Sequence, residues 1–204
     1  MRKKTKIMSF NFSKKYDFLP KLKASNKQLD VVYSHKLLGV ILTSNCKWHE
    51  NTSYIVKKAN RRIWYLRRLK ALGASVDTLM DQYHKSLRSV LEFGAPLWTG
   101  SLTKTNIADI EKVQKTAFKV ILGHQYTGHL NALNVLGETT LEERRLALCK
   151  KYAKKCSKNP KMTSLFPVTR NKTRYGKKFI EPIFKSKRAT NGCVPFLIRL
   201  LNED

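Results

Sequence analysis

Acidic residues are scarce in this sequence, and the patterns of several common functional sites are missing from it. Its 204 residues include 14 Asp and Glu against 41 Lys and Arg, so the formal net charge is +27. The four cysteines form no Cys-x-x-Cys pair, which argues against a zinc site. No apolar run approaches the roughly 18 residues of a membrane span, and no Gly-rich phosphate loop or Ser/His/Asp arrangement stands out. What remains is a basic chain whose partner is expected to be a polyanion.

The positive charge makes nucleic acid the first candidate partner and a membrane surface the second. A charge of +27 causes strong self-repulsion unless an anionic partner or counterions compensate it. The basic start of the chain has no apolar stretch of signal-peptide type after it. We therefore expect an intracellular protein with reduced thiols at Cys46, Cys149, Cys156 and Cys193 and no membrane partner.

Residues 36–73 join the clearest short strand to the longest basic helix. A compact apolar run with one glycine inside it occupies 37–42 and ends in three small polar residues, which is typical of a buried strand or one arm of a hairpin. From Trp48 the apolar residues recur at steps of three and four, which predicts a helix of about 22 residues. The second half of this helix carries Lys57, Lys58, Arg61, Arg62, Arg67, Arg68 and Lys70.

Caps and periodicity predict further helices downstream. Ser75 is expected to cap a helix that Gly94 and Pro96 end. Another helix begins after Thr103 or Thr105 and ends at Gly123. We expect one helical core made of Trp48, Ile55, Ile63, Leu66, Leu79, Tyr83, Leu87, Ile110, Val113 and Phe118.

The last third of the chain is predicted to hold shorter helices and a basic tail. A short helix over 130–136 is expected before Gly137, and Thr140 with Glu143 predicts a capping box for the next helix, which Asn159 and Pro160 end. From residue 161 cations and aromatics alternate without a clear period, which indicates an extended segment that orders on nucleic acid. Residues 194–201 are expected to fold back as a short apolar helix or turn.

The resulting fold class is mainly α, with a short β segment at the start and a partly irregular basic tail at the end. The predicted division places a β segment at 1–45, a helical bundle at 46–123, two further helices at 124–159 and the tail at 160–204. The β segment lacks natural partners for its strands, so exposed edges are expected there.

Several segments resemble the reverse transcriptases of jockey-type non-LTR retrotransposons. Residues 36–70 (KLLGVILTSNCKWHENTSYIVKKANRRIWYLRRLK) look like the join between palm and thumb, where a YLGV strand precedes a W..H...I..KA..R...LRRL helix. Leu37 stands where the family often has an aromatic residue. Further segments in the family's order are KKTKIMSF at 3–10, YHKSLRSVLEFGAPLW at 83–98, IEKVQKTAFKVILG at 110–123, LEERRLALC at 141–149 and VPFLIRLLN at 194–202.

The resemblance implies the end of the palm, the thumb and the post-thumb region of such a polymerase, without its active site. The family's palm holds Mg²⁺ on carboxylates that include an Asp-Asp pair, and this sequence has no such pair. The fingers and most of the palm would precede Met1, so no catalytic residue, no metal and no cofactor is assigned to this chain. The missing fingers and palm of the same polyprotein are an expected partner, and the site of integration in the nucleus is the expected location.

The resemblance also implies the binding residues. The strand before the thumb helps to hold the primer end, which implies Leu38, Gly39 and Val40, and the first thumb helix follows the template-primer duplex, which implies Lys57, Lys58, Arg61, Arg62, Arg67, Arg68 and Lys70. Two other interpretations stay open: a self-standing basic helical protein that binds RNA, DNA or another partner, and a gene-model fragment without function.

Overall fold

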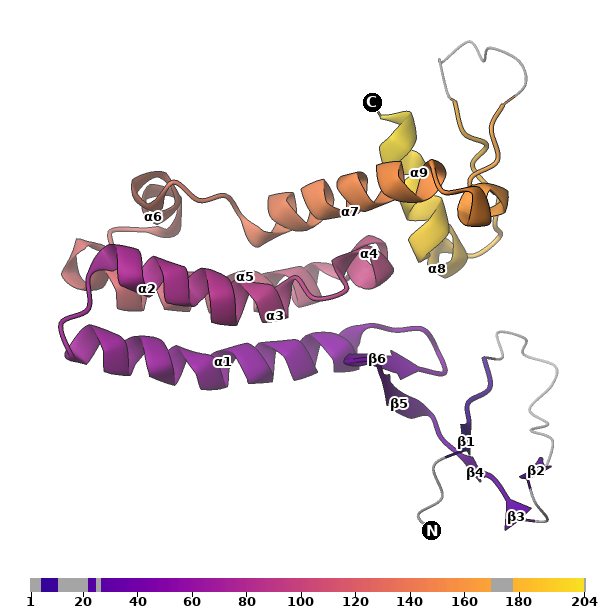
Figure 1. Ribbon diagram of the computed structural model, residues 1–204, viewed down its shortest axis with the longest axis horizontal. Helices are drawn as coiled ribbons and strands as arrows, with labels where there is room; N and C mark the ends of the chain where they lie inside the picture. Colours follow the sequence, from indigo (N-terminus) through magenta and orange to yellow (C-terminus); the bar gives the residue numbers. More distant parts are fainter. Residues whose placement is uncertain (1–4, 11–21, 25–26, 170–177, 204) are drawn as a thin grey trace. The chain divides into compact units, whose positions relative to one another are not determined.

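The chain is mainly helical and forms two compact units, residues 1–54 and 55–204. The structure is a computed structural model, which describes residues 5–10, 22–24, 27–169 and 178–203. The predicted fold class, short strands at the start followed by helices, is confirmed (Figure 1). The boundary between the units follows residue 54, whereas the sequence placed it after residue 45.

The first unit contains short strands that pair in twos. Strand β1 (Lys6–Ile7) pairs in parallel with β4 (Asp30–Val31), and β2 (Lys23–Ala24) pairs antiparallel with β3 (Lys27–Gln28). Two-residue strands of this kind offer few ladder hydrogen bonds and little apolar surface. Of the predicted β segment at 1–45, residues 1–4, 11–21 and 25–26 lie outside the described part.

The longest strand pair is a hairpin of β5 (Ser34–Leu37) and β6 (Val40–Thr43), paired antiparallel from Ser34 with Thr43 to Leu37 with Val40. The predicted apolar run is therefore divided between both arms, because Leu38 and Gly39 form its two-residue turn. Both turn residues have positive φ, 47° and 91°, as in the type I′ turn that suits the twist of hairpin strands. Glycine adopts this conformation freely, but leucine does so at a cost of roughly 1–2 kcal/mol.

Within the first unit, the hairpin is bound to the first turns of helix α1 (His49–Ala71). The Asn51 side-chain carbonyl accepts a hydrogen bond of 3.0 Å from the Ile41 amide. The Ser34 hydroxyl donates to Glu50, and Lys36 Nζ lies 2.6 Å from the Tyr54 hydroxyl. These bonds fix both strands of the hairpin to the start of the helix.

Helix α1 is the predicted basic helix, and from residue 55 it belongs to the second unit. Its apolar stripe, Ile55, Ala59, Ile63 and Leu66, is fully buried. Helix α1 lies alongside the next helical segment (Figure 1).

That segment is a continuous helix in three parts: α2 (Val76–Gln82), the π-helical η1 (Tyr83–Arg88) and α3 (Ser89–Leu91). Ser75 caps it as predicted, since its hydroxyl accepts from the Thr78 amide. The buried residues at 79, 83, 87 and 91 are spaced by four. In a straight α-helix each such step passes a full turn by about 40°, so the row would leave the core. The wider π turn keeps these side chains on one side.

The chain then turns at Gly94 into α4 (Ala95–Trp98) and the short 3-10 helix η2 (Thr99–Ser101). Helix α5 (Lys104–Leu122) begins at the Thr103 cap and ends at Gly123, as predicted. After the 3-10 turn η3 (Gly123–Gln125), α6 (His129–Leu136) ends at Gly137 in the left-handed conformation.

Nine of the ten predicted core residues are buried, which confirms the bundle core. Within it, the rings of Tyr83 and Phe118 meet edge to face with their centres 5.2 Å apart. The tenth residue, Trp48, is half-buried and belongs to the first unit.

Helix α7 (Leu141–Ser157) begins with the predicted capping box of Thr140 and Glu143. Its first half contacts α4 and α5, and its second half contacts α9 (Cys193–Asn202). A second apolar cluster forms there from Cys149, Ala153, Cys156, Phe166, Phe179, Leu197, Ile198 and Leu200.

The predicted basic tail is thus partly packed against α7. Its described part contains the 3-10 helix η4 (Pro160–Leu165), α8 (Lys187–Thr190) and α9, which confirms the predicted apolar helix near the end. Asn202 holds the backbone of Phe179 by two hydrogen bonds of 3.0 Å, one to its amide and one to its carbonyl. Phe166 and Phe179 are therefore part of a packed apolar cluster, and residues 170–177, which carry several of the predicted cations, lie outside the described part.

Candidate nucleic-acid interface

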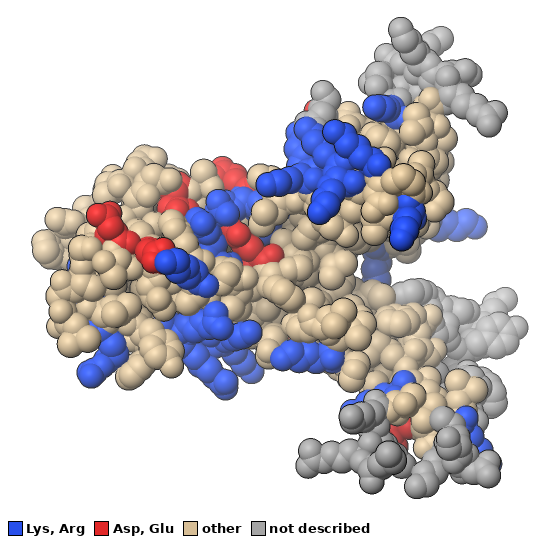
Figure 2. Space-filling view, viewed as in Figure 1, with Lys and Arg blue, Asp and Glu red and all other residues tan. Residues whose placement is uncertain are grey.

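The outer face of α1 concentrates exposed cations. Lys57, Lys58, Arg61, Arg67 and Arg68 are all exposed, while the apolar stripe on the other side of the same helix is buried. From Lys57 to Arg68 the helix rises about 16 Å, a length over which one strand of a duplex carries about five phosphates. Figure 2 shows Lys and Arg side chains projecting along this edge of the second unit.

These cations have no carboxylate partners among the residues that the structure describes. The described ion pairs join Asp81, Glu92, Glu111, Glu138 and Glu181 to cations on other elements. None of these described pairs involves a cation of α1, so the outer face of α1 keeps its positive charge.

Two of the predicted binding residues are directed toward neighbouring helices. Arg62 Nη1 donates to the Ser86 carbonyl at 2.5 Å, and Lys70 Nζ donates to the Ile121 carbonyl at 2.9 Å. Both side chains join α1 to the rest of the second unit. Sequence periodicity alone did not show that these side chains bind carbonyls of other helices, although position 70 follows Leu66 by four residues and so continues the line of the buried stripe.

Two arginines of the second unit outside α1 form ion pairs with glutamates. Arg144 Nε and Nη2 bind both carboxylate oxygens of Glu92, at 2.5 and 3.3 Å. Glu138 accepts from His84 Nε2 and from Arg88. These pairs connect the loop before α7 and the start of α7 to the α2–α3 segment.

Arg145 is buried more deeply, with 1% of its surface exposed, and its Nη2 lies 3.7 Å from Glu111. Burial lowers the pKa of the Arg145 guanidinium, and the charge of Glu111 opposes this only in part. Burial likewise raises the pKa of the Glu111 carboxyl. Both shifts have the same cause, the loss of water around a charge, so this pair is a structural feature of the interior with no access to a polyanion.

In the first unit, the predicted primer-contacting residues form the tip of the hairpin. Leu38 is 89% exposed, whereas the Val40 side chain is buried. Of these three predicted residues, Leu38 exposes its side chain at the tip, and Gly39 can be contacted only through its backbone. Leu38–Val40 belong to the first unit, whereas the cations of α1 from Lys57 onward belong to the second.

Sequence reasoning missed two aromatic residues on the outer face of α1. Trp64 and Tyr65 are 56% and 55% exposed, although Trp98 and Tyr83 in the same unit are completely buried. Their ring centres lie 5.1 Å apart at 81°, and the Arg68 guanidinium lies 5.8 Å from the centre of the Trp64 ring. The signal was present in the spacing, because positions 64 and 65 follow Arg61 by three and four residues and thus share its face.

No protein-family model, curated protein or solved structure matches this chain significantly. The resemblance of the sequence segments to reverse transcriptases is thus not tested by any match, and this family stays a proposal.

A second basic surface covers the far half of α7, on the opposite edge of the second unit in Figure 2. Lys151, Lys154, Lys155 and Lys158 are exposed there. Lys154, Lys158 and Lys178 line a hollow of about 460 Å³ beside Asn202. Cations in the last turns of a helix also stabilise its negative end, so this surface has a structural explanation that most of the outer face of α1 lacks.

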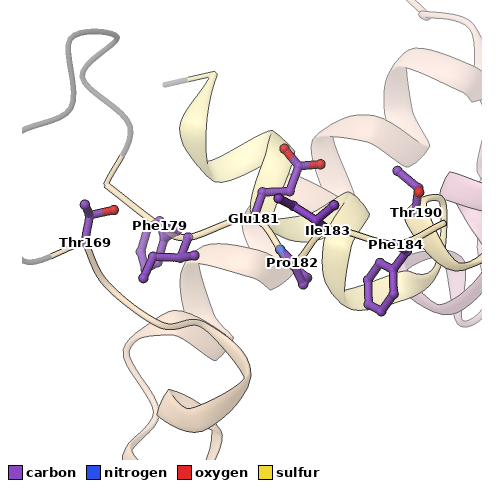
Figure 3. A pocket seen from close by; sticks show the side chains of 8 residues that line it. Thr169, Phe179, Glu181, Pro182, Ile183, Phe184 and Thr190 are labelled. Carbon is purple, nitrogen blue, oxygen red and sulfur yellow. The ribbon is translucent and has the colours of Figure 1, made fainter.

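A more apolar hollow of about 560 Å³ lies between Thr169 and Thr190 (Figure 3). Ile183 is almost fully exposed beside it, and Glu181 is paired with Arg199 at 3.0 Å. None of the described residues that line this hollow is a cation.

Within the described ranges, no cluster of three His, Cys, Asp or Glu side chains is placed to bind a metal ion. No helix in the described part combines the length and apolar character that a membrane crossing needs.

Proposed function

We propose that this chain is the thumb and post-thumb part of a non-LTR retrotransposon reverse transcriptase, which grips a template-primer duplex through α1 and performs no polymerase chemistry by itself. The observation that carries the proposal is the division of α1 into a buried apolar stripe and an exposed face whose cations have no carboxylate partner among the described residues. Lys57, Arg61 and Arg68 lie on the outermost line of this face. The resemblance of residues 36–70 to the palm–thumb join supports the choice of polymerase family.

Binding of this kind acts on phosphates and is largely independent of sequence. Each phosphate that a cation neutralises releases counterions, so the logarithm of affinity falls with the logarithm of salt by about 0.9 per contact on duplex DNA. The rigid helix sets the register of the contacts, because α1 is fixed to the bundle by its stripe and by Arg62 and Lys70.

The test is a duplex-binding titration over several salt concentrations. Charge reversal by Lys57→Glu with Arg61→Glu should reduce the salt slope by about two units and weaken binding similarly for all sequences. The matched control is Lys112→Glu with Lys115→Glu on α5, which changes the net charge equally at exposed positions and should leave the slope nearly unchanged.

A third pair, Lys154→Glu with Lys155→Glu, examines the α7 surface. A reduced slope for this pair, together with an unchanged slope for Lys57 and Arg61, would move the binding surface to α7 and contradict the proposal. Primer extension is measured separately, because phosphate binding and polymerase chemistry are independent.

The second candidate is a self-standing basic protein that binds RNA or DNA. It is favoured by the closure of the second unit, in which α9 covers the second half of α7 and completes an apolar cluster. An open reading frame that continues upstream into an Asp-Asp-containing palm would decide for the polymerase. A transcript that begins at Met1 would decide for the self-standing protein.

A further inference from the structure

The outer face of α1 exposes two aromatic rings where a duplex-binding helix needs only cations. Phosphate contacts come mainly from charged side chains and small hydrogen-bond donors, whereas a tryptophan offers one indole N–H beside a large apolar ring. Trp64 and Tyr65 remain more than half exposed although the same fold buries Trp98 and Tyr83 completely. Exposed aromatic area of this size commonly marks a binding surface.

The rings lie inside the row of cations. Lys57, Arg61, Trp64 and Arg68 follow each other at steps of four, three and four residues, so they form one line along the helix. Tyr65 stands beside this line, four residues after Arg61 and three before Arg68. A nucleic-acid strand whose phosphates lie along the cations therefore brings its bases within reach of the rings.

We propose that Trp64 and Tyr65 form a stacking site for unpaired bases, so that α1 binds single-stranded nucleic acid in addition to duplex; this inference rests on the proposed function. In a duplex, neighbouring base pairs cover the faces of the bases, and an aromatic side chain can stack only on a base that is unpaired. The two rings stand at 81° to each other, so their faces point in different directions and can serve different bases. Aromatic stacking beside cations is the general mode of single-strand recognition.

Arg68 links the two kinds of contact. Its guanidinium lies 5.8 Å from the Trp64 ring centre, which places a phosphate-binding group directly beside a stacking surface. A guanidinium in this position also limits the orientations of the ring, so less freedom is lost when a base stacks on it.

The experiment compares a short single-stranded oligonucleotide with a blunt hairpin duplex of the same composition, by fluorescence anisotropy. Trp64→Ala with Tyr65→Ala should weaken single-strand binding by roughly 5- to 100-fold and leave duplex binding and both salt slopes unchanged, because no charge is removed. Trp64→Phe with Tyr65→Phe keeps two rings and should retain most of the single-strand affinity. Single-strand binding should quench part of the tryptophan emission of the natural protein, and this quenching should be missing in Trp64→Phe.

The matched control is Phe93→Ala, which removes an aromatic ring of similar exposure, 53%, away from α1. Its backbone carbonyl, which accepts from Trp98 Nε1, is retained. This variant should bind both probes as the natural protein does, and circular dichroism of every variant checks that the helices are intact.

Three outcomes overturn the inference. Equal losses on both probes would show that the rings support the helix and do not stack on bases. Unchanged binding to both probes would remove the rings from the interface, even where the salt slope of Lys57→Glu with Arg61→Glu still supports phosphate binding. Loss of a dimer in the Ala variant, with nucleic-acid affinity unchanged, would assign the face to a second copy of this chain.

Discussion

Truncation of Leu87 examines the interior of the helical bundle most directly. Leu87 lies within the π-helical segment η1 and is completely buried. Leu87→Ala removes three buried carbon atoms and leaves a cavity, which costs roughly 2–5 kcal/mol of unfolding free energy. For a unit of 150 residues, from 55 to 204, each kcal/mol lowers the melting temperature by about 2–4 °C, so a decrease of roughly 4–20 °C is expected.

The assay is urea unfolding followed by circular dichroism, with thermal melting as a second readout. Leu130→Ala is the matched control, because Leu130 on α6 is 76% exposed and its loss should change stability by less than about 0.5 kcal/mol. A destabilisation below about 1 kcal/mol for Leu87→Ala would refute the reasoning, since it would mean that the side chain is not part of a packed core.

Three further predictions concern the buried pair, the thiols and the chemistry. Replacing both charges of the buried pair, as in Glu111→Gln with Arg145→Met, should leave the unfolding free energy unchanged or raise it by about 1–4 kcal/mol. The reason is that burial disfavours the charged form of each group. A decrease of more than about 2 kcal/mol in the unfolding free energy, measured by urea unfolding, would contradict this prediction. Burial raises the pKa of the Cys193 thiol to about 11, so its alkylation in the folded protein should be slow at pH 8 and should accelerate about tenfold per pH unit as the thiolate forms; mass spectrometry of the alkylated protein gives the rates. Primer extension by the pure chain with Mg²⁺ or Mn²⁺ should give no product above a blank, and reproducible extension would end the proposal of an inactive thumb.

The helices were predictable from the sequence because their ends are encoded locally. Ser75, Thr103 and Thr140 each accept a hydrogen bond from the backbone amide three residues later, and Gly137 ends α6 in the left-handed conformation. Such caps depend on a few neighbouring residues, so the order of the chain alone reveals them.

The second apolar cluster was harder to predict because it joins distant segments. Phe179 is surrounded in sequence by lysines, which favoured an irregular tail, but Asn202 fixes its backbone and α7 covers its ring. Hydrogen bonds between residues 23 positions apart leave no periodic signal. The hairpin turn at Leu38 was likewise unexpected, because leucine is unusual at positive φ.

The candidate interface was predictable in its location but not in its composition. The periodicity of α1 correctly separates the buried stripe from the cationic face. It does not reveal that Arg62 and Lys70 donate to carbonyls of other helices, since hydrogen bonds to residues 24 and 51 positions away leave no periodic signal. It also treats Trp64 and Tyr65 as ordinary apolar residues, whereas the structure leaves them in solvent.

The π-helical segment has a consequence for insertions and deletions. A single π turn inside an α-helix accommodates one residue more than the straight helix would. With its present number of residues, a straight α-helix would turn Leu91 by about 120° from Leu79, whereas deletion of one residue between Tyr83 and Arg88 would restore ordinary α geometry with Leu91 about 20° from Leu79. The buried row on one side of this helix thus depends on the number of residues in it as much as on their identity. A relative with an uninterrupted α-helix at this place would align with this chain only across a gap of one position.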